Sequence, residues 1–286
     1  MPNTPAVRSP SALVVPDDVR RDLLRSQAEE VGTPQRLPLI KIMPAAAGLY
    51  EFNDRTPPQT EREFQGVILG SHARNVLWDG AYGEERAEAD RGPACSSRDG
   101  KIGVPRAGFA HAALQSGHGV VVAASGTEQI ECASCPYNAF GSKRMISETG
   151  SPKGKAVANQ RSVYVMIDGR RSPMELLIVN TSIPPFDEYL NSLLQREIPV
   201  QSVITTFRQE RKNRVGAAGQ YAVATFENTG TLTPEQFTRI LTLRTEYMHF
   251  IRPSDPVATT DTSEDLDDSR NETLVEADEA EDDLPF

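Results

Sequence analysis

The sequence predicts a mainly β fold with a few helices. Residues 63–78 contain two apolar groups, Val67-Ile68-Leu69 and Val76-Leu77-Trp78, and predict one long strand. Residues 162–179 flank Asp168-Gly169 with apolar residues, and this dipeptide favours the tight turn of a β-hairpin. Two further runs, 202–214 and 220–226, are separated by a glycine-containing turn and predict a second pair of strands.

The remaining elements can be placed around these strands. Residues 1–36 are rich in Pro, Ser and charge and predict a mobile N-terminal arm. The short apolar run 37–44 is bounded by prolines, which predicts an edge strand. Gly66 and Gly70 allow the long strand to bend or to form a bulge.

Two helices are predicted from apolar residues at helical spacing. The first follows Pro184 and ends near Leu194. The second runs from Thr233 to Tyr247, with Thr233 as the N-cap and Pro234 in the first turn.

Residues 79–160 are predicted to be an insertion after the long strand, because they are rich in Gly, Ser and charge and show weak periodicity. Within the insertion, residues 120–124 predict one buried strand. A basic stretch near its end either follows a phosphate backbone or faces solvent, and it consists of Lys143, Arg144, Lys153, Lys155 and Arg161.

All three cysteines, Cys95, Cys132 and Cys135, lie in this insertion. The C-x-x-C spacing of the last two suits a zinc knuckle, because two thiolates on one tight turn can face the same ion. A tetrahedral site needs a fourth ligand, and the zinc-ribbon pattern would place a cysteine near Val157, where there is none. The candidates are His111, His118 and Asp99. Three interpretations stay open: a structural zinc site, a decayed site, and a redox pair, which lacks a thioredoxin-like βαβ context.

Charge is distributed unevenly along the chain. The net charge is −10, but residues 255–286 hold 13 Asp and Glu against one Arg, a net charge of −12. The remaining 254 residues hold 29 Lys and Arg against 27 Asp and Glu, a net charge of +2. The acidic composition therefore does not exclude nucleic-acid binding by the body. A hypothesis is that the acidic tail competes with DNA for a groove on that body.

Cations and aromatic rings occur together at two places, and this combination is typical of single-strand grooves, where cations bind phosphates and rings stack on bases. At the end of the long strand the candidates are Arg74, Trp78 and Tyr82. On the second strand pair they are Phe207, Arg208, Arg211, Lys212, Arg214 and Tyr221. The alternatives are a Trp78 ring that caps the core and a basic turn that is merely solvated.

The chain ends in a run of carboxylates followed by Asp282, Asp283, Leu284, Pro285 and Phe286. Acidic runs stay solvated, so we expect a disordered tail (253–286) whose terminal ring can enter a partner's pocket. This tip resembles that of bacterial and phage single-stranded-DNA-binding proteins, which ends in several Asp followed by Ile-Pro-Phe. The resemblance implies recruitment of replication, recombination and repair enzymes. The alternative is a tail that only improves solubility.

The predicted order of long strand, insertion, hairpin, helix and two strands is that of the OB-fold, a partly open barrel that binds oligonucleotides. The layout resembles the zinc-ribbon-bearing OB domain of the large subunit of replication protein A. We therefore expect an OB-fold domain at 37–252 with its insertion at about 79–160.

These observations predict a protein that coats single-stranded DNA and recruits enzymes through its tip. The alternative is an adaptor that recruits an enzyme without touching DNA. An enzyme is not expected, since no paired-carboxylate or His-based constellation lies on adjacent elements. We expect a cytoplasmic protein, on the nucleoid or in the host cytoplasm if phage-encoded, because the sequence shows neither a signal pattern nor an apolar run of about 20 residues. Homo-oligomers remain compatible with the sequence.

Overall fold

The computed structural model describes residues 37–43, 48–79, 92–117, 119–123, 126–146, 154–213 and 220–252. The chain divides after Leu37, and every element named below belongs to the unit that follows. The described residues are mainly β, as predicted. Some predictions concern residues outside the described ranges, and these are the arm (1–36), Tyr82, His118, Lys153, Arg214 and the tail (253–286).

The strands are β1 (Leu39–Ile42), β2 (Tyr50–Phe52), β3 (Gln59–Glu61), β4 (Glu63–Leu77), β5 (Cys95–Ser97), β6 (Ile102–Pro105), β7 (Val120–Val122), β8 (Glu128–Glu131), β9 (Val157–Met166), β10 (Met174–Val179), β11 (Val203–Asn213) and β12 (Gln220–Thr231). The α-helices are α2 (Ala112–Ser116), α3 (Ile183–Gln195), α4 (Pro234–Glu246) and α5 (Met248–Ile251). Short 3-10 turns are η2 (Pro136–Asn138), η3 (Ser142–Met145), η4 (Asn180–Ser182) and η5 (Val200–Ser202).

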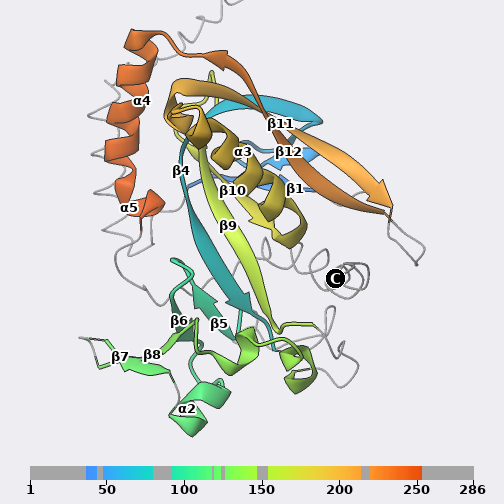
Figure 1. Ribbon diagram of the computed structural model, residues 1–286, viewed down its shortest axis with the longest axis vertical. Coiled ribbons are helices and arrows are strands. Elements are labelled where there is room, and N and C mark those ends of the chain that lie inside the picture. The colour runs from blue at the N-terminus through green and yellow to red at the C-terminus, as the bar shows by residue number, and fades with distance from the viewer. Residues whose placement is uncertain are drawn as a thin grey trace, which may run out of the picture. The chain divides into compact units, whose positions relative to one another are not determined.

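The sheet is built on β4, which lies beside β9 over most of its length (Figure 1). The first residues of β4, Glu63–Gly66, pair with β11, and its remaining residues pair with β9. Since β9 also pairs with β10, the spatial order is β11-β4-β9-β10. Of these four strands, β11 comes last in the chain and lies beside β4, which comes first, as in a Greek key. A register shift between Ile68 and Gly70 confirms the irregularity expected from the glycines of this strand.

β1 differs from its prediction as an edge strand. It pairs with β10 in parallel and with β2 in the antiparallel direction, so both of its edges are used. The prolines do not prevent this, because Leu39–Ile42 contains no proline and every residue of the strand keeps its N–H. The carbonyl of Pro38 also accepts the backbone N–H of Glu175, which continues the contact with β10.

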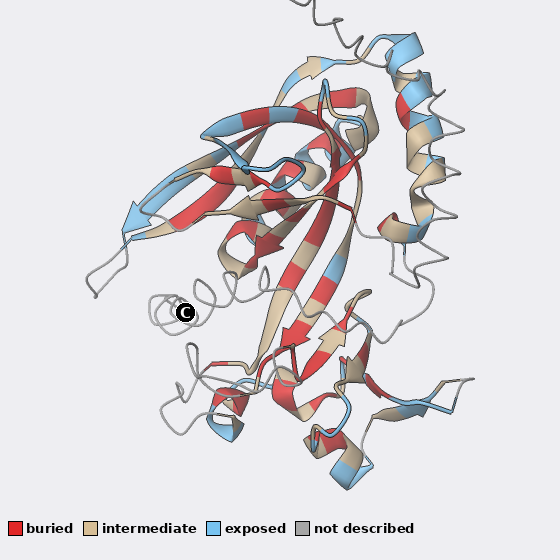
Figure 2. Ribbon diagram, turned by 180° about the vertical axis from the view of Figure 1, so that it is seen from behind, coloured by how far each residue is buried: buried red, intermediate tan, exposed pale blue. Residues whose placement is uncertain are grey.

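Aromatic rings form the centre of the main hydrophobic core. Phe64 on β4 stacks on Phe207 of β11, with 4.4 Å between ring centroids and 4° between ring planes. Tyr50 and Phe52 of β2 meet Phe64 edge-on, and Phe226 of β12 meets Phe207 in the same way. Figure 2 shows the buried residues concentrated on these central strands. The core therefore joins β2, β4, β11 and β12.

Both predicted long helices are present as α3 and α4. The N-cap assigned to Thr233 is confirmed, because its hydroxyl accepts the N–H of Gln236 while the Gln236 side chain accepts the N–H of Thr233. Arg244 of α4 donates from Nε to the carbonyl of Leu69, which attaches this helix to β4. None of the helices in the described part of the chain is long and apolar enough to span a bilayer.

The residues between β4 and β9 form a smaller set of elements with a hydrophobic cluster of their own. β5 pairs with the end of β4, where Cys95 lies opposite Leu77, and β6, β8 and β7 follow in spatial order. β7 corresponds to the strand predicted at 120–124, but its burial was predicted wrongly: Val121 and Val122 are 43% and 67% exposed. The reason is that β7 is the last strand in this order.

Tyr50 leads to a prediction for alkaline pH. Its ring is buried, its hydroxyl donates to the carbonyl of Arg208 at 2.9 Å, and burial raises the pKa of its phenol well above the usual value. Above about pH 10 the unfolded chain loses this proton while the folded chain keeps it, so the free energy of unfolding falls as pH rises.

We expect Tyr50→Phe to make this fall shallower by up to about 1.4 kcal/mol per pH unit, measured by urea unfolding between about pH 8 and pH 11. At pH 8 the variant should be less stable by about 1 kcal/mol, because the hydrogen bond is lost. An identical alkaline slope in both proteins would contradict the prediction.

Candidate functional site

The residues predicted to bind DNA lie on two parts of the sheet. Arg74 is on β4 and Trp78 follows it directly, whereas the other described candidates belong to the β11–β12 hairpin. Trp78 packs against Val76 and Leu177, and only 9% of its surface is exposed. Arg74 is 8% exposed. The burial of Trp78 favours the alternative interpretation, in which its ring packs against the protein instead of stacking on a base.

Arg74 belongs to a buried polar layer on the face of β4 and β9 that points away from the aromatic core. Arg74 lies opposite Gln160 and His72 lies opposite Ser162, while the rings of His72 and Tyr164 are 5.5 Å apart. Such polar and aromatic groups suit contacts with nucleotides, but the layer is covered. This layer was not predicted, because residues 159–162 of β9 are all polar and do not alternate with apolar residues.

The His72 ring shows how this layer is held. Its Nδ1 lies 3.1 Å from the carbonyl oxygen of Ile251 in α5. Burial lowers the pKa of His72, and the carboxylate of Glu175 opposes that shift. The helix α5 therefore contributes a polar contact to this face.

The β11–β12 hairpin provides accessible cations. β11 pairs with β4 only from Thr205 to Arg208, so the remainder of β11 is supported by β12. In this outer part, Arg211 and Lys212 are exposed, and Lys212 lies directly opposite the half-buried Tyr221. A cation beside an aromatic ring can hold a phosphate while the ring stacks on a base.

Phe207 requires a correction. It was predicted to stack on a base, but its ring has no exposed surface and is stacked on Phe64 inside the core. A ring with no accessible face cannot contact a nucleotide. The alternation of the strand places Phe207 on the inner face, and the sequence alone did not say which face was inside.

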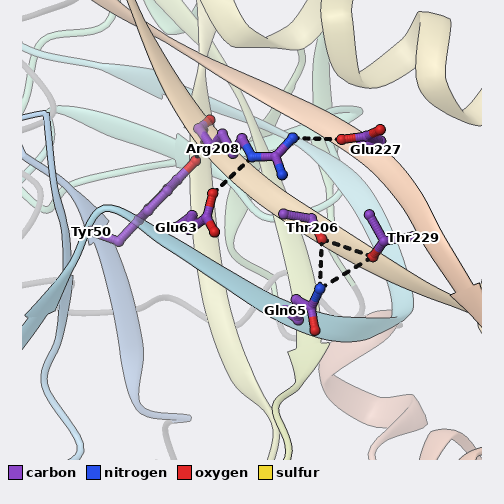
Figure 3. Close-up of polar contacts among 7 residues, drawn as sticks. All are labelled: Tyr50, Glu63, Gln65, Thr206, Arg208, Glu227 and Thr229. Atoms are coloured by element: carbon purple, nitrogen blue, oxygen red, sulfur yellow. Dashed lines mark hydrogen bonds and ion pairs between the residues drawn. The ribbon is translucent and has the colours of Figure 1, made fainter.

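Arg208 is exposed, but two carboxylates already hold its guanidinium group (Figure 3). Its Nε donates to Glu63 on β4 at 2.8 Å and its Nη1 donates to Glu227 on β12 at 2.5 Å. Nearby, Gln65 donates to the hydroxyl oxygens of Thr206 and Thr229. These contacts join β4, β11 and β12 across their shared surface, so Arg208 acts first as a link between strands.

One exposed ring was not among the predicted site residues. Phe140, between η2 and η3, is 65% exposed, and the ammonium group of Lys155 lies 4.5 Å from its ring centroid. Arg144 and Met145, which follow in η3, are also exposed. The signal was the presence of Phe140 just before the basic stretch, where an aromatic ring had not been considered.

The three cysteines come together in the small cluster of the insertion. Cys95 begins β5, and Cys132 and Cys135 lie in the turn between β8 and η2. All three cysteines are buried and none forms a disulfide bond. They line one cavity together with His111, the N-cap residue of α2, whose Nε2 lies 3.7 Å from Sγ of Cys135.

The environment of this cluster favours neutral side chains. Burial raises the pKa of Cys95, and the neighbouring thiols of Cys132 and Cys135 add to the shift. Burial also raises the pKa of Cys135, against the opposing effect of the Tyr137 and Asn138 backbone N–H groups. Burial lowers the pKa of His111 to about 4. As they stand, no three His, Cys, Asp or Glu side chains in the described ranges form a group that could hold a metal ion.

The chain matches no protein-family model, no curated protein and no solved structure. Functional assignment therefore depends on the residues and their geometry.

A substitution at Gly103 can test the packing of the three cysteine side chains. A methyl group at Gly103 would stand 2.9 Å from Sγ of Cys95, so we expect Gly103→Ala to lower the free energy of unfolding by about 1–3 kcal/mol. In a Cys95→Ala background the sulfur is gone, and the same change should cost less than about 0.5 kcal/mol. A double-mutant cycle by urea unfolding measures both costs, and equal values would contradict the packing described here.

Proposed function

We propose that this chain is a single-stranded-DNA-binding protein built on an OB-type barrel. β4, β9, β10, β11 and β12 would be strands one to five, with α3 between the third and the fourth. The ladders β4–β9, β9–β10, β4–β11 and β11–β12 support this assignment, because the OB-fold is a five-stranded Greek-key barrel. Ser182, just after β10, accepts the backbone N–H of Ala224 in β12 and so links the two ends of the strand order.

The observation that carries the proposal is the position of two cation and ring pairs, in which Phe140 and Lys212 are exposed and Lys155 and Tyr221 are half-buried. In OB-folds the connections between strands one and two and between strands four and five bind oligonucleotides. Here the first of these connections contains Phe140 and Lys155, and the hairpin of the other contains Lys212 opposite Tyr221. Both proposed ligand-binding connections therefore carry a cation for a phosphate and a ring for a base.

The proposed mode of binding has no sequence preference. Phosphate contacts are electrostatic, and every base offers a face for stacking, so neither type of contact distinguishes bases strongly. The acidic tail would then recruit replication or repair enzymes through Leu284, Pro285 and Phe286. This part of the proposal rests on the resemblance of the tip, because the tail lies outside the described residues.

The first test is fluorescence anisotropy of a labelled oligo-dT with the full chain over a salt series. We expect the affinity for oligo-dT to fall as the salt concentration rises. Unlabelled single-stranded DNA should displace the labelled oligonucleotide, whereas double-stranded DNA should not. Replacing Arg211 and Lys212 with alanine should reduce the slope of log K against log salt by about 1.4, since each contact with a single strand contributes about 0.7.

The matched control removes the same charge elsewhere, by replacing the exposed Arg196 and Arg239 with alanine, and should leave the slope nearly unchanged. An equal reduction of the salt slope in both variants would show that the β11–β12 hairpin does not contact the DNA. If the unmodified chain did not bind DNA, this result would favour the adaptor function.

A second test separates the exposed ring from the buried one. Phe140→Ala should weaken oligo-dT binding by about 1–3 kcal/mol, roughly 5-fold to 150-fold, with little change in stability. Phe207→Leu should lower the free energy of unfolding and leave the affinity of the folded protein unchanged. Anisotropy and urea unfolding of both variants check this, and the opposite pattern would reverse the two assignments.

A further inference from the structure

One cavity in the insertion is lined by every cysteine of the chain and by one histidine. Cys95, Cys132, Cys135 and His111 approach it from three separate segments, and its other walls include the apolar residues Leu77, Ile130 and Val157. His111 has no exposed surface, and the three cysteines are 8–9% exposed. These are the side chains that a structural zinc ion prefers, in the number that a tetrahedral site requires.

We propose that Cys95, Cys132, Cys135 and His111 bind a structural zinc ion, with His111 as the fourth ligand. The distance between Sγ of Cys135 and Nε2 of His111 agrees with this assignment. In a tetrahedral site with Zn–S of about 2.3 Å and Zn–N of about 2.0–2.1 Å, a sulfur and a nitrogen ligand stand about 3.6 Å apart. Sγ of Cys135 and Nε2 of His111 are 3.7 Å apart.

The sulfurs of Cys95 and Cys132 both lie beside Gly103. A Cβ placed on Gly103 would stand 2.9 Å from Sγ of Cys95 and 3.7 Å from Sγ of Cys132, so both sulfurs lie close to one point of the β6 backbone. Gly103 has no side chain to separate them. The described side chains are not yet closed around one centre, so the proposed metal binding would reorient the cysteine side chains about χ1.

The turn after Cys132 has the features of a metal knuckle. The backbone N–H of Cys135 donates to the carbonyl of Cys132 at 3.4 Å, and the backbone N–H of Asn138 donates to the carbonyl of Cys135 at 2.9 Å, so both cysteines lie in hydrogen-bonded turns. The amide of Asn138 also donates to the carbonyl of Cys132 at 3.0 Å, which closes the turn. The C-x-x-C pair is therefore presented on a rigid segment.

The structure also separates the candidates for the fourth ligand. Asp99 is used elsewhere: its Oδ1 accepts the backbone N–H groups of Lys101 and Ile102 and the hydroxyl of Ser97, at 2.7, 2.9 and 3.0 Å. Asp99 does not line the cavity, whereas His111 does. His118 is outside the described residues, so His111 is the histidine that the geometry assigns.

Metal binding requires a defined movement of protons. Nδ1 of His111 now accepts the backbone N–H of Ala113 at 3.1 Å, so the neutral ring carries its proton on Nε2. Coordination through Nε2 moves this proton to Nδ1 and opens the contact with Ala113. Each thiol that becomes a thiolate ligand releases one proton to solvent, so binding of one Zn²⁺ to three thiols releases three protons.

The test uses the full chain, loaded with Zn²⁺ and in parallel with Co²⁺. We expect one tightly bound zinc ion per chain by elemental analysis, and for Co²⁺ the intense absorption of a tetrahedral thiolate site. His111→Ala should weaken metal affinity by more than about 100-fold, since even outer partners of metal ligands are worth 10–100-fold. His111→Cys should restore tight binding and shift the cobalt bands, because it supplies a fourth thiolate.

His249→Ala is the matched control, because His249 is an exposed histidine of the described chain in α5, and it should bind metal as the unmodified chain does. Circular dichroism of each variant checks folding. Less than about one tenth of a metal ion per chain after loading would overturn the site. Equal affinities of His111→Ala and His249→Ala would overturn the assignment of His111. Neither outcome depends on whether the protein binds DNA.

Discussion

The first residues of β4 pair with a different strand from its remaining residues, and the rest of the structure depends on this constraint. A long strand carries hydrogen-bonding groups along its whole length, and burying them unpaired is costly. β11 satisfies the first residues, β9 satisfies the following ones, and β5 adds a pairing at the end. The main core and the insertion are consequently held by the same strand, with Phe64 in one hydrophobic cluster and Leu77 in the other.

The stacked rings of Phe64 and Phe207 lock the first of these pairings. The two residues lie directly opposite each other in the ladder, so a slip of β11 by one residue would place the two rings on opposite faces of the sheet. The same register leaves the outer part of β11 free of β4 and lets the hairpin carry Arg211 and Lys212 away from the core. Core packing thus determines where the proposed DNA-binding cations stand.

The insertion also has a hydrophobic cluster of its own, which is smaller than the main core. Its hydrophobic cluster contains small side chains and two of the thiols, including Ala94, Ala113, Cys95 and Cys135. Small cores supply little stabilisation, and a metal ion is a common supplement. The proposed zinc site would stabilise the segment that leads from the C-x-x-C turn to Phe140, so the metal site would also support the proposed DNA-binding ring.

The sequence by itself determined the long strand, both hairpins, the two long helices and the N-cap at Thr233, because periodicity, turn residues and caps are local signals. It also singled out the C-x-x-C pair and the basic residues of the second hairpin. The tertiary structure alone decided which rings are buried, so Phe207 and Trp78 were predicted as stacking residues and Phe140 was missed. It also placed β1 between two strands and brought His111 to the three thiols. Alternation along a strand shows that its faces differ, but only packing against distant segments decides which face is covered and which residues far apart in the chain become neighbours.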